Sequence, residues 1–68
     1  MQVRARILEP GTLVKIHHPG TGERGVWRIT GRVRNSGLDD PAYDLTHMQT
    51  GRMRVLRRSR LKLIRRAP

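Results

Sequence analysis

The chain has 68 residues and no cysteine, and its 15 Lys and Arg outnumber five Asp and Glu to give a net charge of +10. This length allows one small domain with a thin core, which argues against a deep substrate cavity, and the absence of cysteine excludes disulfides and thiolate metal sites. Because no apolar run approaches the roughly 20 residues that cross a bilayer and no signal-peptide stretch opens the chain, we expect a soluble cytoplasmic protein.

Period-two alternation of apolar and polar residues dominates the first third of the chain, which is typical of strands. Residues 3–7 alternate strictly between apolar and basic side chains. Residues 13–17 form a second predicted strand, with Val14 and Ile16 on one face. The Gly-rich segment 19–25 that follows is predicted to be a loop.

Residues 26–34 carry the clearest strand pattern. Trp27, Ile29 and Val33 fall on one face, and Trp27 is expected in the core rather than as a platform for a base. Gly31 in mid-strand predicts a bend or bulge. The side chains predicted for the opposite face are Arg28, Thr30, Arg32 and Arg34.

The second half continues as short elements separated by turns. They are a loop at 35–41, strands at 43–47, 52–55 and 61–64, a tight turn at 50–51 and a short helical turn at 58–60. A helix over 52–66 is the competing interpretation. The strand pattern predicts an all-β fold, a small antiparallel barrel of five to six strands. Residues 1–64 would form this single domain and residues 65–68 a basic C-terminal tail.

Charge is unevenly distributed along the chain. Residues 1–34 carry seven bases and two acids, net +5, residues 35–51 carry three Asp and no base, net −3, and residues 52–68 carry eight bases and no acid, net +8. Of the 15 bases 13 are Arg, whose planar guanidinium contacts phosphate in bidentate fashion. Arginines that only keep the outward face of a strand in contact with water would explain the alternation of apolar and basic residues. They would not explain why so few Glu residues balance the positive charge. We therefore expect a basic face that binds a polyanion.

The spacing of Gly and apolar residues resembles that of SH3-like barrels, including KOW and Tudor-like modules. Residues 11–16 and 25–29 are similar to the opening hairpin, and residues 43–45, Gly51 and residues 61–64 to the closing part. The resemblance covers about residues 9–64 and implies a five-stranded barrel that often binds nucleic acid or protein. An extra N-terminal strand precedes the pattern.

Two further resemblances do not extend to function. A Tudor-type aromatic cage needs several aromatic residues, and the chain has only Trp27 and Tyr43. The barrel also resembles the plasmid-encoded type II dihydrofolate reductase, whose pore motif Val-Gln-Ile-Tyr is absent. Residues 53–56 read Met-Arg-Val-Leu at that place, so the reductase activity is not carried over.

Other candidate sites have structural explanations. Residues 20–25 match G-x-G-x-x-G, but a strand follows where a dinucleotide site requires a helix. His17, His18 and His47 are expected to be exposed rather than to bind a metal. Asp39, Asp40 and Asp44 lack the buried surroundings that acid–base chemistry needs, and Asp39-Asp40-Pro41 is typical of a turn. We therefore predict no enzyme activity, no cofactor and no metal site.

The expected function is nucleic-acid binding through arginine contacts with phosphates, with little sequence specificity, on DNA or structured RNA, as in a regulator or accessory factor. Arg28, Arg32 and Arg34 would track one backbone, since every second strand residue is about 7 Å apart. The complete predicted set is Arg28, Arg32, Arg34, Arg52, Arg54, Arg57, Arg58, Arg60, Arg65 and Arg66. The alternative is a protein-interaction or assembly module, such as a basic subunit of a virion or larger complex, whose sheet edges or acidic stretch contact another copy.

Overall fold

Antiparallel strands make up nearly all of the regular structure in the computed structural model, which describes residues 7–68. The strands are β1 (Leu13–Ile16), β2 (Trp27–Arg32), β3 (Ala42–His47), β4 (Met53–Arg57) and β5 (Leu61–Arg65), with a short 3-10 turn, η2 (Arg58–Arg60), before β5. The all-β prediction is confirmed. The predicted strand at 3–7 lies outside the described residues except for Ile7, which is not in a strand.

The C-terminal segment forms two strands, β4 and β5, rather than the competing helix. A helix over 52–66 is wrong, because β4 pairs with β3 and β5 pairs with β1 in antiparallel registers. Only the predicted helical turn at 58–60 is helical. β5 runs one residue beyond the predicted domain limit at 64, and the Ala67 backbone N–H donates to the Thr12 hydroxyl at 3.3 Å. Within residues 7–68 no helix has the length and apolar character to cross a bilayer.

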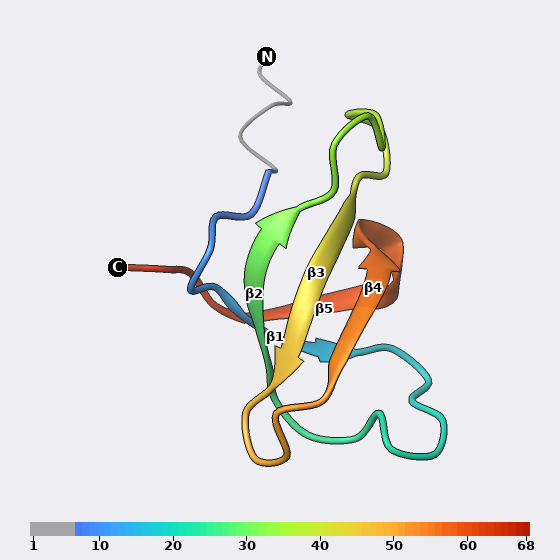
Figure 1. The fold of residues 1–68 in the computed structure, drawn as a ribbon, viewed down its shortest axis with the longest axis vertical. Coiled ribbons are helices and arrows are strands. Elements are labelled where there is room, and N and C mark those ends of the chain that lie inside the picture. Colours follow the sequence, from blue (N-terminus) through green and yellow to red (C-terminus); the bar gives the residue numbers. More distant parts are fainter. Residues whose placement is uncertain (1–6) are drawn as a thin grey trace.

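The five strands form one sheet in the order β4-β3-β2-β1-β5. Figure 1 shows β2, β3 and β4 running upright, whereas β1 and β5 run across them, so the sheet turns back over itself. β4 and β5 are the two edges, and the sheet is not closed. This arrangement is compatible with an SH3-like barrel.

The core fills the space between the two parts of the folded sheet. It consists of the apolar side chains that alternation directs inward from four of the strands, together with Leu8: Leu8, Val14, Ile16, Trp27, Ile29, Tyr43, Leu45 and Leu61. Trp27 and Tyr43 are fully buried, which confirms Trp27 as a core residue. Burial of two such rings contributes on the order of 10 kcal/mol of apolar stabilisation.

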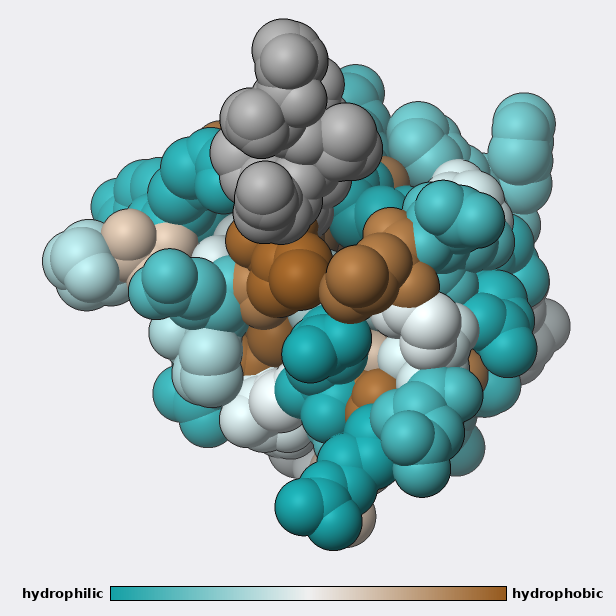
Figure 2. Space-filling model, turned by 90° about the horizontal axis from the view of Figure 1, so that it is seen from above, coloured by the Kyte–Doolittle hydropathy of each residue, from teal (hydrophilic) through white to brown (hydrophobic). Residues whose placement is uncertain are grey.

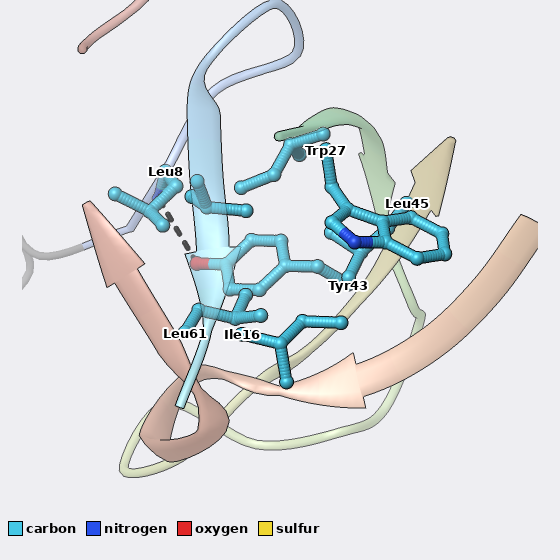
Figure 3. Packing of buried hydrophobic residues seen from close by; sticks show 8 residues of the cluster. Leu8, Ile16, Trp27, Tyr43, Leu45 and Leu61 are labelled. Carbon is cyan, nitrogen blue, oxygen red and sulfur yellow. Dashed lines mark hydrogen bonds between the residues drawn. The ribbon is translucent and has the colours of Figure 1, made fainter. Parts of the chain in front are cut away.

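Polar groups inside the core are satisfied. The Leu8 backbone N–H donates to Tyr43 Oη at 2.9 Å, which fastens the segment before β1 across the apolar cluster (Figure 3). The Trp27 indole N–H donates to the Glu23 carbonyl at 3.0 Å. The loop between β1 and β2 is thereby attached to the core from within.

Two β-bulges interrupt the sheet. In β2, Ile29 pairs with Leu45 but Gly31 pairs with Asp44, so Thr30 is an extra residue and the predicted irregularity at Gly31 is confirmed. In β5, Val14 pairs with Leu63 but Leu13 pairs with Arg65, which leaves Ile64 as the extra residue. An extra residue reverses which side chains point to which face beyond it.

Candidate nucleic-acid interface

Arginines that the sequence groups together fall into two classes in the structure. One class is bound within the molecule, and we call its members the tied arginines: Arg54, Arg57, Arg58 and Arg60. The other predicted arginines make no side-chain hydrogen bond or ion pair with any residue between 7 and 68. They are Arg28, Arg32, Arg34, Arg52, Arg65 and Arg66.

Glu23 is the internal counter-ion of two tied arginines. Its carboxylate lies 3.5 Å from the Arg54 guanidinium and 3.6 Å from that of Arg60, and the Gly20 backbone N–H donates to it at 2.8 Å. Only 12% of the Glu23 side chain is exposed. Arg54 faces this carboxylate because its partner in the register is the core residue Leu45, which places Arg54 on the inner face of β4.

Arg57 and Arg58 bind backbone carbonyls instead of acids. The Arg57 guanidinium donates to the Asp40 carbonyl at 2.9 Å and the Ser36 carbonyl at 3.3 Å, so it holds the loop between β2 and β3. The Arg58 guanidinium donates to the Leu61 carbonyl at 2.7 Å. These side chains stabilise the turn into β5, a role that charge counting along the chain does not reveal.

The prediction that Arg28, Arg32 and Arg34 share one strand face is wrong. Arg28 pairs with Thr46 and Arg32 pairs with Tyr43, and directly paired residues share a face. Thr46 and Tyr43 are three residues apart on β3 and therefore face opposite sides. The bulge at Thr30 causes the difference, and Arg34 lies beyond the end of β2.

The structure instead gathers bases from β5, β1 and β2 on the outer face of the sheet. Leu13 pairs with Arg28 on one side and with Arg65 on the other, so these two arginines flank β1 about 10 Å apart, which is two strand spacings. Lys15 on β1 pairs directly with Lys62 on β5. We call this set the cationic face: Lys15, Arg28, Lys62 and Arg65.

Two members of the cationic face, Lys15 and Lys62, were absent from the predicted set. Each is exposed and stands between inward apolar neighbours, so alternation within residues 13–17 and 61–64 was the signal that could have found them. Arg65 joins them only because of the bulge at Ile64. The five strands contain a single acid, Asp44, whose partners are Gly31 and Val55.

Histidines divide between surface and interior. His17 and His18 are exposed, as expected, but His47 is only 7% exposed, so the expectation of an exposed side chain is wrong for it. Its ring is nearly perpendicular to the Trp27 ring, at an interplanar angle of 84°, and the two ring centroids lie 4.8 Å apart. Among residues 7–68, no three His, Asp or Glu side chains are grouped so as to hold a metal ion.

The face that lies uppermost in Figure 1 is mostly hydrophilic. Hydrophilic residues cover most of that face and surround a small apolar area (Figure 2).

Comparison of the chain with protein families, curated proteins and solved structures finds no match. The functional assignment therefore depends on the charge, register and contacts described above.

Proposed function

We propose that this protein binds nucleic acid through phosphate contacts made by the cationic face. The observation that carries the proposal is the pairing of Lys15 with Lys62 beside the Arg28–Leu13–Arg65 row. Like charges directly opposite in an antiparallel pair destabilise a sheet. Their presence on a face without an acid on β1, β2 or β5 is explained by a polyanionic partner that neutralises them.

The mechanism is electrostatic. Each phosphate that a base neutralises releases condensed counter-ions, so log affinity falls by about 0.9 per log unit of salt for each contact with duplex DNA. The four bases of the cationic face contribute about −3.6 to this slope. The side chains contact the backbone rather than base edges, so binding distinguishes poorly between sequences, and the contact extends to DNA and structured RNA.

An SH3-like barrel of the KOW type is the finer fold assignment that we attach to this proposal. The strand order, with η2 leading into a β5 that pairs with β1, supports it. The arrangement presents β1 between β2 and β5, which is why bases from distant parts of the sequence can engage one stretch of backbone.

A salt titration of binding to random-sequence duplex DNA and to hairpin RNA tests the proposal. We expect micromolar or tighter binding at low salt, and the Arg28→Gln/Arg65→Gln variant should lower the slope by about 1.8. The matched control is Arg32→Gln/Arg34→Gln, which removes the same charge elsewhere and should retain most of the slope.

Two results would contradict the proposal. Absence of binding to both nucleic acids at low salt would remove its basis. An equal decrease in both double variants in the slope of log affinity against log salt would show that net charge, rather than the cationic face, governs binding.

A further inference from the structure

A hollow lies between the loop that joins β1 to β2 and the turn that joins β3 to β4, and none of the four residues of the cationic face lines it. One wall carries Arg24 and the other carries Arg52. The complete lining is Pro19, Gly20, Thr21, Gly22, Arg24, His47, Thr50 and Arg52. The lining residues therefore include two arginines, two threonines and two glycines, and none of them is acidic.

His47 fixes the two walls relative to each other. Its Nε2 lies 2.8 Å from the Arg24 carbonyl, to which it donates, and its Nδ1 accepts from the backbone N–H groups of Gln49 and Thr50 at 3.1 and 3.2 Å. One buried imidazole thus connects the loop wall with the turn wall. A site whose walls are fixed in this way loses less conformational entropy when a ligand binds.

The glycines allow close approach in the hollow. Gly22 has a φ of +79°, and a Cβ there would lie 2.5 Å from Arg52 Nη1. The Arg52 guanidinium therefore lies directly against backbone that has no side chain. Gly25, at φ +101°, packs against the His47 ring in the same manner, since a Cβ would lie 3.1 Å from Nε2.

The loop's own acid, Glu23, is not among the residues that line the hollow. The Glu23 carboxylate binds Gly20 N–H, Arg54 and Arg60, and Glu23 does not line the hollow although its neighbours Gly22 and Arg24 do. Arg24 and Arg52 make no side-chain hydrogen bond or ion pair within residues 7–68. Their charges are consequently available to an anion.

We infer that this hollow is a phosphate subsite in which Arg24 and Arg52 bind the oxygen atoms of one phosphate group. Guanidinium forks match phosphate geometry, and the threonine hydroxyls can donate to the remaining oxygens. The subsite deepens the proposed function, because a phosphate of bound nucleic acid, either in the backbone or at a strand end, is its ligand.

Titration with inorganic phosphate at constant ionic strength tests the subsite without nucleic acid. In amide NMR spectra we expect saturable shifts centred on Thr21, Gly22, Thr50 and Arg52. Arg24→Gln/Arg52→Gln should weaken phosphate binding roughly tenfold or more, and Arg24→Lys/Arg52→Lys, which keeps the charge but not the fork, should weaken it less. Arg32→Gln/Arg34→Gln is the matched control and should bind phosphate as the wild type does.

Short duplexes with a 5′-phosphate or a 5′-hydroxyl distinguish the two sources of phosphate. A strand-end ligand predicts that Arg24→Gln/Arg52→Gln weakens only the phosphorylated duplex, whereas a backbone ligand predicts equal weakening of both. Unsaturable shifts, or unchanged affinity of this variant for phosphate, would overturn the subsite. Neither result would alter the salt slope due to Arg28 and Arg65, so the two proposals can fail separately.

Discussion

The outer face of β5, β1 and β2 and the side formed by β4 and η2 are both rich in bases, but they use them differently. On β4 and η2 the tied arginines hold Glu23 and the carbonyls of Ser36, Asp40 and Leu61. On the cationic face, Lys15 and Lys62 stand opposite each other. The net charge of a segment therefore does not report how much of that charge can reach a partner.

Apolar exposure sharpens the contrast. On β4, Met53 is 80% exposed and Val55 57% exposed, on the same outer side as Asp44 and Thr46. The β4 side thus combines internal ion pairs with an apolar, partly acidic outer surface. On β1 and β5, by contrast, the outer surface carries bases. Stability and polyanion binding are consequently expected to respond to different substitutions.

The largest effect on stability is expected at Asp40, which anchors η2 to the loop between β2 and β3. Its carboxylate accepts from the Ser59 backbone N–H at 2.7 Å and the Ser59 hydroxyl at 2.8 Å. Asp40→Ala should lower the free energy of unfolding by about 2 kcal/mol, a decrease in Tm of roughly 8–16 °C. Thermal denaturation followed by circular dichroism measures it. Asp39→Ala is the control and should leave Tm nearly unchanged.

A smaller effect is expected for a tied arginine. Arg57→Gln removes the two hydrogen bonds to the Ser36 and Asp40 carbonyls and should cost about 1 kcal/mol. Its affinity for duplex DNA should fall less than that of Arg28→Gln, although each variant loses one charge. Urea denaturation and a binding titration on the same samples provide the comparison. A DNA affinity that falls as far as in Arg28→Gln would mean that Arg57 is also a contact residue.

The smallest expected effect has the opposite sign. Lys62→Glu replaces the like-charge pair with Lys15 by an opposite-charge pair and should stabilise the fold by about 0.5 kcal/mol while weakening nucleic-acid binding. Lys62→Gln should lie between wild type and Lys62→Glu in both properties. Loss of stability in Lys62→Glu would indicate that the two lysines do not repel each other.

Alternation and turn chemistry were sufficient to predict the fold class and most elements. The strands from 13 onward, the helical turn at 58–60, the irregularity at Gly31 and the burial of Trp27 all follow from local residue pattern. Each depends on neighbours within a few residues, where physical preferences act directly. The strand predicted at 3–7 remains a prediction.

Which bases share a face could not be predicted, because bulges depend on the partner strand. The position of Thr30 as the extra residue in β2 is determined by pairing with β3, and that of Ile64 in β5 by pairing with β1. Likewise, the bonds from Glu23 to Arg54 and Arg60 join segments that are distant in sequence. Both the positions of the bulges and these ion pairs depend on contacts between segments far apart in the sequence, which the alternation of residues within one strand does not reveal.

The contact between Trp27 and His47 gives the molecule an optical reporter of its own. The chain has one tryptophan, so all indole fluorescence comes from the ring whose N–H donates to the Glu23 carbonyl in the loop and which packs nearly perpendicular to the His47 ring. The same histidine joins the two walls of the hollow. Any rearrangement of those walls changes the surroundings of a single chromophore, so its emission can be followed without a label.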